Sequence, residues 1–188
     1  MERGIHKLGL EDLSHKDWVP KFPDFRKVDM EDMKSFQRYA SRFRPYSDFS
    51  FVSLHCWNID GMTSFSNLHG NLIIRMNHYT EDREMFIPFG SNRCDETVSE
   101  LFNHANRLDL VPSEFVNNLF THEQNMVIAE DPNNFDYVIS TLKVARMEGG
   151  EFSKKRAKIS KFKRENPDSQ FRQVNVSDYQ TELVELFD

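Results

Sequence analysis

The residues of this chain best suited to chemistry are the cations gathered between Lys143 and Arg164. This stretch holds nine basic residues and only the acids Glu148 and Glu151, a net charge of +7, whereas the rest of the chain carries −13. Clustered, mobile cations bind phosphates by releasing counterions, and an anionic lipid surface gains about 1 kcal/mol per nearby basic residue. The predicted anion-binding residues are Lys154, Lys155, Arg156, Lys158, Lys161 and Arg164. A solvated linker helix, balanced by acids of an adjacent domain, is the competing interpretation.

A second candidate is the pair Asp136-Tyr137, which the local pattern places in the middle of a strand. A carboxylate there could orient a substrate amine, or pair with a backbone amide or a cation. If it is buried, it could pair with Arg156 or Lys155 of the following helix. Asp136 and Tyr137 would then form a structural latch between domains.

Other familiar chemistries lack the residues that they need. His55 and Cys56 are adjacent, and neighbours on a helix do not face each other, so no nucleophile–base pair is predicted and Cys56 is expected to be packed and inert. The seven histidines show no metal-ligand spacing, so no metal site is predicted. The chain also lacks the R/Q-x-x-G-x-G/A loop of acetyl-CoA-dependent enzymes and the glycine-rich nucleotide loops, so no cofactor is expected.

These residues must be positioned by an alternation of strands and helices. Hydrophobic periodicity predicts a strand at 25–28, a helix that begins at Asp29 and ends before Pro45, and a short helix within 48–58. A hairpin is predicted over 63–78 with its turn at 69–71. The remaining predicted elements are strands at 85–89, 126–129, 135–139 and 171–176 and helices at 95–108, 112–120, 151–165 and 178–187.

This order predicts a mixed α+β or α/β fold with helices over a central sheet. The 188 residues suffice for a real core, and 17 Phe argue against disorder. No stretch approaches the ~20 apolar residues of a membrane helix, and no signal peptide is apparent at the start. We therefore expect a soluble, cytoplasmic protein without a transmembrane segment, and its two cysteines are most simply reduced thiols.

The stretch from Asn133 to Pro167 resembles a known family pattern. Its strand, Asn134-Phe135-Asp136-Tyr137-Val138, is similar to "N-x-D-Y-V", and its continuation from Gly150 to Lys163 is similar to "G-x-x-Y-x-K-K-R-N-x-I-x-x-F". The aromatic segment from Asp48 to Trp57 is also similar. The pattern belongs to the C-terminal-domain family of phosphatidylglycerol lysyltransferases, which includes many uncharacterised bacterial proteins. Phe152 and Ala157 replace the Tyr and Asn that are usual in the family.

The resemblance implies tandem GNAT-like acyltransferase domains, with a mostly antiparallel central sheet, joined through the basic segment. We expect an N-terminal extension over 1–21, a first GNAT-like domain over 22–142, a basic linker helix region over 143–166 and the start of a second similar domain over 167–188. The implied activity is transfer of an aminoacyl group from aminoacyl-tRNA to an anionic lipid or similar acceptor, incomplete as a catalyst in this chain, with no catalytic residue identified.

Two other readings stay open at this point. One is a non-catalytic module that binds tRNA or anionic lipid, or that acts as a scaffold. The other is a homo-oligomer in which two chains supply each other's missing half.

Overall fold

The structure is a computed structural model that describes residues 18–58, 61–77, 83–120 and 126–170, with Arg172, Gln173, Asn175, Tyr179 and Glu185. The chain divides into two compact units, residues 1–136 and residues 137–188. Each unit is described by itself below. The domain boundaries expected from the sequence stay predictions.

The first helical segment of unit 1 begins with a capping box. The Asp29 side chain accepts from the backbone amide of Glu31, and the Asp32 side chain accepts from the backbone amide of Asp29. A 3₁₀ turn, Met30–Asp32, then leads into α1, Met33–Ala40, which buries Phe36 and Tyr39 on one side. The predicted start at Asp29 is therefore confirmed.

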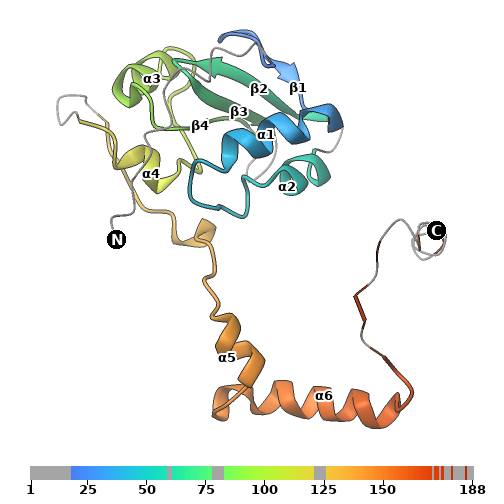
Figure 1. Cartoon of the computed structure of the whole chain (residues 1–188). Helices are drawn as coiled ribbons and strands as arrows, with labels where there is room; N and C mark the ends of the chain where they lie inside the picture. Colours follow the sequence, from blue (N-terminus) through green and yellow to red (C-terminus); the bar gives the residue numbers. More distant parts are fainter. Residues whose placement is uncertain are drawn as a thin grey trace, which may run out of the picture. The chain divides into compact units, whose positions relative to one another are not determined.

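A four-stranded antiparallel sheet forms the centre of unit 1 (Figure 1). Its strands, in spatial order, are β1 (Arg26–Lys27), β2 (Thr63–Leu68), β3 (Asn71–Asn77) and β4 (Glu84–Phe89). The predicted hairpin is confirmed, with Phe65 opposite Ile74 and a tight turn at His69-Gly70. Both turn residues have positive φ, 55° and 83°, as a two-residue hairpin turn requires.

Helices cover both faces of this sheet (Figure 1). Because strand side chains alternate, Leu72 and Ile74 lie in one core with α1 and α2 (Phe51–Cys56), whereas Ile73 lies in the other with Leu101 of α3 (Cys94–Leu101). The first core is aromatic: the rings of Phe36 and Phe65 stack with centroids 5.7 Å apart. A last short helix in this unit, α4, spans Ser113–Val116.

Two predicted helices are shorter than expected. The helix predicted over 95–108 ends at Leu101, and the one predicted over 112–120 is reduced to α4. The apolar residues beyond Leu101 still contribute to the hydrophobic core, because Ala105 and Leu108 pack against the second core from irregular backbone. Apolar spacing therefore identified the packed residues but not the end of the helix.

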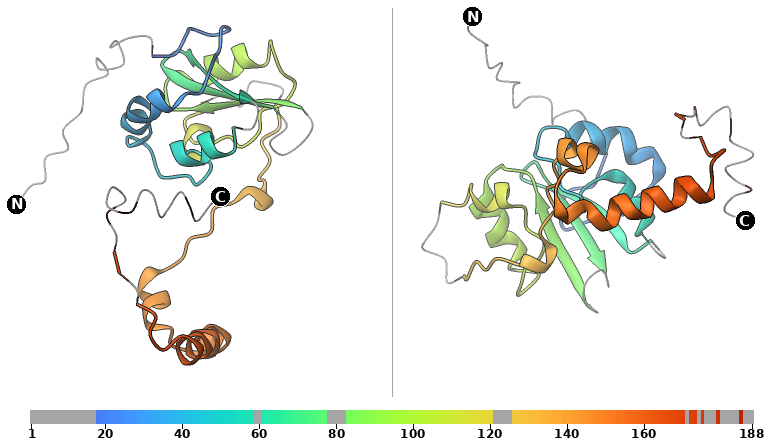
Figure 2. Two further views of the ribbon diagram at one scale, coloured as in Figure 1. Left: turned by 90° about the vertical axis from the view of Figure 1, so that its right-hand side faces the viewer. Right: turned by 90° about the horizontal axis from the view of Figure 1, so that it is seen from below.

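The described secondary structure of unit 2 is helical, with irregular backbone at 137–140, 147–149 and 166–170. Helix α5 spans Thr141–Arg146, a 3₁₀ turn covers Gly150–Phe152, and α6 spans Ser153–Glu165. Figure 2 shows α6 along its full length, after the turn that follows α5. The predicted basic helix is confirmed.

The prediction of two strands, one on either side of Asp131, is wrong. The residues at 126–129 and 135–139 have irregular backbone and join no described strand. Most of their apolar residues are exposed, with Val127 at 93% and Val138 at 98%, whereas Met126 is partly buried and packs against Cys94, Val98 and Phe115. The last predicted strand and helix, 171–176 and 178–187, lie mostly outside the described residues. The described chain is a mixed α+β protein, as predicted.

Candidate functional site

Helix α6 concentrates positive charge at the surface of unit 2. Over 13 residues it carries seven cations and one carboxylate, Glu165, and every one of these side chains is exposed. The seven cations are the predicted anion-binding residues Lys154, Lys155, Arg156, Lys158, Lys161 and Arg164, together with Lys163. Within α6 the ion pair given by the structure joins the Lys161 ammonium to Glu165 at 3.8 Å, a weak and exposed contact. Most of the positive charge therefore faces solvent, where phosphates can approach it.

Arg156 differs from the lysines of α6 because its guanidinium donates to backbone carbonyl groups of unit 2. Its Nη1 donates to the carbonyl oxygen of Met147 and, at 2.9 Å, to that of Gly149. Met147 has φ 48° and Gly149 φ 95°, values typical of a turn, and the chain turns here between α5 and α6. Arg156 thus holds the turn that orients the start of α6. Its predicted contact with phosphate stays a prediction.

The sequence placed Asp136 in a strand and offered Arg156 or Lys155 as its partner. In the structure Asp136 lies on irregular backbone at the end of unit 1, and its Oδ1 accepts from both the backbone amide (3.2 Å) and the hydroxyl of Ser47. Ser47 belongs to the loop before α2, whose first turn is capped by Ser50. The contact therefore fixes residue 136 to unit 1. Tyr137, the first residue of unit 2, is 94% exposed.

Replacing Asp136 by Ala is expected to free the Ser47 amide. One exposed hydrogen bond to a charged acceptor contributes about 1 kcal/mol, which corresponds to about fivefold faster hydrogen exchange at that amide. Exchange measured residue by residue by NMR is the test. Asp136→Asn keeps an acceptor oxygen and is expected to retain part of the protection. Asp131→Ala removes a carboxylate that binds Asn134 instead, so an equal effect at Ser47 would contradict the assignment.

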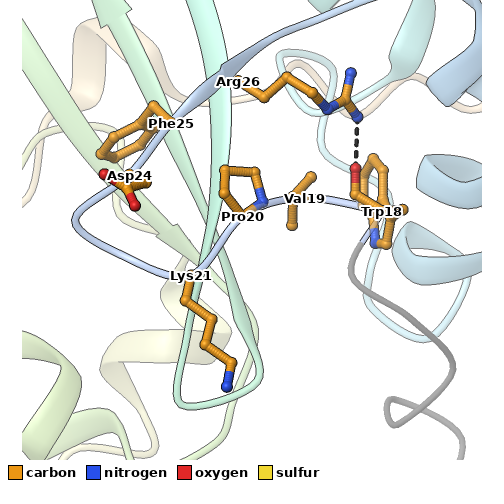
Figure 3. A pocket seen from close by; sticks show the side chains of 7 residues that line it. All are labelled: Trp18, Val19, Pro20, Lys21, Asp24, Phe25 and Arg26. Atoms are coloured by element: carbon orange, nitrogen blue, oxygen red, sulfur yellow. Dashed lines mark hydrogen bonds between the residues drawn. The ribbon is translucent and has the colours of Figure 1, made fainter.

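One pocket of unit 1 is formed by the segment that leads into β1 (Figure 3). It measures about 600 Å³ and is lined by Trp18, Val19, Pro20, Lys21, Asp24, Phe25 and Arg26. The segment is pinned to β2, because the Phe22 amide donates to the Asn67 carbonyl at 2.9 Å. Arg26 donates to the Trp18 carbonyl at 2.6 Å and to both oxygens of Asp32, which raises the pKa of Arg26. Its charge is thus already compensated within the fold.

A second pocket of about 380 Å³ lies beside an arginine cluster that the sequence analysis missed. The Asp109 carboxylate, 9% exposed, is 2.7 Å from Arg83 Nη1 and 2.7 Å from Arg107 Nε. The Arg107-Leu108-Asp109 spacing was visible in the sequence, but Arg83 is far from it along the chain. Because one carboxylate is shared by two guanidinium groups, the cluster ties the residues after α3 to the start of β4.

The amino terminus of α3 lies shortly after β4 in the chain. Side chains of the first turn of α3, and of the residue before it, occupy this terminus. Arg93 Nε donates to Glu96 at 2.9 Å and lowers the pKa of that carboxyl, while Asp95 accepts from the Phe120 amide at 3.2 Å. Two carboxylates in the first turn disfavour a bound pyrophosphate.

The cysteine environments differ from the expectation, because Cys56 is exposed and Cys94 is the buried thiol.

Among the described residues, no three histidine, cysteine or carboxylate side chains come together as metal ligands do. None of the described helices has the length and apolar character needed to cross a bilayer.

Comparisons with known proteins give a structural neighbour and, separately, a sequence family. A conserved protein of unknown function from Bacteroides thetaiotaomicron VPI-5482 has the same fold, with a TM-score of 0.67 at 18% sequence identity over 90% of this chain. The match covers 58% of that protein's chain, so the present chain spans little more than half of its length. No curated protein matches. The sequence model for the C-terminal region of phosphatidylglycerol lysyltransferase matches residues 40–188, so the chain belongs to that family.

Proposed function

We propose that α6 binds the phosphates of aminoacyl-tRNA or of an anionic lipid headgroup, in aminoacyl transfer of the phosphatidylglycerol lysyltransferase type. The observation that carries the proposal is the charge of α6: seven exposed cations and one carboxylate on a helix of 13 residues. Such a surface attracts polyanions without reading sequence, because binding releases condensed counterions. Family membership supports this substrate class.

The fold of unit 1 supports the same proposal. A four-stranded antiparallel sheet with helices on both faces is compatible with a GNAT-like acyltransferase domain. The acidic first turn of α3 argues against a CoA thioester held at that helix by its pyrophosphate. An aminoacyl-tRNA donor does not require a pyrophosphate-binding site at α3, because in this proposal its phosphates bind to α6.

Salt dependence of tRNA binding tests the proposal directly. If about five cations of α6 meet phosphates, the logarithm of the association constant should fall with the logarithm of salt concentration with a slope of about −4. Filter binding of tRNA across a salt series measures this slope, with sedimentation of phosphatidylglycerol vesicles in parallel. A slope near zero for both partners, or no binding at low salt, would contradict the proposal.

A transfer assay on the same samples distinguishes a transferase from a binding module. Transfer of a labelled aminoacyl group from charged tRNA to phosphatidylglycerol supports the catalytic reading. Salt-dependent binding without transfer favours the non-catalytic anion-binding module.

A further inference from the structure

Helix α6 also exposes apolar residues, and they lie along one side. Phe152 is the residue directly before α6, and at 3.6 residues per turn Phe152, Ile159 and Phe162 fall within an arc of about 80°. Phe162 is 55% exposed, Ile159 is 38% exposed, and Phe152 is half-buried. We call these three residues the apolar stripe. Exposure of an apolar side chain such as Phe162 to water is energetically unfavourable. The apolar stripe therefore indicates a surface that a binding partner covers.

Lysines occupy the edges and the middle of the apolar stripe. By helical position, Lys158 borders it on one side and Lys163 on the other, while Lys155 projects between Ile159 and Phe162. The Lys155 ammonium lies 5.6 Å from the centre of the Phe152 ring. Each lysine can lay its aliphatic stem along apolar atoms and still extend its charge to a polar layer.

We propose that the apolar stripe lies in the surface of an anionic lipid bilayer, with Phe162 and Ile159 at the acyl-chain boundary and the flanking lysines at the lipid phosphates. This inference rests on the proposed function and names the polyanion that α6 meets. Exposed apolar side chains flanked by basic ones on a helix of low overall hydrophobicity can lie at a membrane interface. The orientation places the ammonium groups where the negative surface potential is strongest.

The same features argue against other occupants of the stripe. A second α6 would bring two helices of net charge +6 together, and like charges at an interface disfavour binding. A close-packed protein core would remove Lys155 from water, and burial of an unpaired ammonium is costly. RNA phosphates would use the lysines but leave Ile159 in water. A bilayer interface satisfies both kinds of side chain.

The test separates apolar insertion from phosphate attraction. The double variant Ile159→Ser/Phe162→Ser keeps every charge of α6, and serine at these exposed positions changes helix propensity little. We expect this variant to bind phosphatidylcholine–phosphatidylglycerol vesicles about tenfold or more weakly, while its affinity for tRNA changes less than about twofold. The matched control, Val127→Ser/Val138→Ser, removes two other exposed apolar side chains and is expected to bind vesicles as the original chain does.

A spectroscopic variant reports the environment of the stripe. With Phe162→Trp, the added tryptophan emission should shift to the blue on mixing with vesicles that contain phosphatidylglycerol, and brominated lipid should quench it. Vesicles of phosphatidylcholine alone should produce neither effect at the same lipid concentration.

Each contrary outcome has a distinct meaning. Unchanged vesicle binding by the serine variant, or no blue shift, overturns the inference, while salt-dependent binding of tRNA would leave the proposed function standing. Weaker tRNA binding by the serine variant identifies RNA as the occupant, and a changed sedimentation coefficient identifies a second copy. Absence of any binding to tRNA and to anionic vesicles overturns both proposals.

Discussion

Reversing Lys154, Lys155 and Lys158 to Glu is expected to lower the affinity for tRNA and for anionic vesicles by about 10³-fold. The substitution takes α6 from a net charge of +6 to zero, since each reversal changes the charge by two. At about 1 kcal/mol for each cation near a charged surface, the loss reaches about 4 kcal/mol, even if a third of the effect is screened. Filter binding and vesicle sedimentation at low salt measure it.

A matched variant distinguishes this surface from the charge of the whole chain. Lys21, Lys27 and Lys34 are exposed lysines of unit 1, and reversing them to Glu changes the net charge by the same amount. This control is expected to bind both partners within about threefold of the original affinity, because screening confines exposed charges to a range of about 10 Å. Equal losses in the two variants would mean that net charge, and not α6, governs binding.

Much of unit 1 could be predicted from local patterns. The turn residues at 69–71 marked the hairpin of β2 and β3, and Asp29 marked the start of the first helical segment, because a hairpin turn and a helix cap are specified by adjacent residues. The strand predicted at 135–139 failed for a physical reason. Its residues suit a strand, but a strand requires a partner to share its backbone hydrogen bonds, and no described strand pairs with it.

The candidate site was predictable in composition but not in its contacts. The basic residues and the helix that carries them followed from the sequence. The partner of Asp136 did not, since Ser47 lies 89 residues away and the interaction depends on tertiary structure. Arg156 was grouped with its lysine neighbours because charge patterns do not show which cation also meets the carbonyl groups of the preceding turn.

Replacing Tyr39 by Phe is expected to lower the free energy of unfolding by about 3 kcal/mol near neutral pH. The Tyr39 hydroxyl donates to the Phe89 carbonyl at 2.5 Å and accepts from the Leu72 amide at 3.0 Å, so one side chain of α1 joins β3 and β4. Tyr39 is 6% exposed, and removal of its hydroxyl leaves two buried backbone groups without this partner, at about 1 to 3 kcal/mol each. Urea unfolding followed by circular dichroism measures the change.

The pH dependence of that loss provides a second, independent check. Burial raises the pKa of Tyr39 to about 12, from an ordinary value of 10.0, so the folded chain favours the neutral phenol. Stability from this group is therefore complete below pH 10 and is lost as the pH rises through 12. The original chain should lose stability over this range more steeply than Tyr39→Phe, and the gap between the two should narrow by up to about 2.7 kcal/mol.

Two further comparisons assign the alkaline effect to Tyr39. Burial also raises the pKa of Cys94 to about 11, which destabilises the fold between pH 9 and 11, but this thiol is present in both chains and cancels in their difference. Tyr137→Phe removes a phenol that is 94% exposed and should match the original chain at every pH. A gap between the original chain and Tyr39→Phe that stays constant up to pH 12 would show that the Tyr39 hydroxyl is not held neutral between α1 and the sheet.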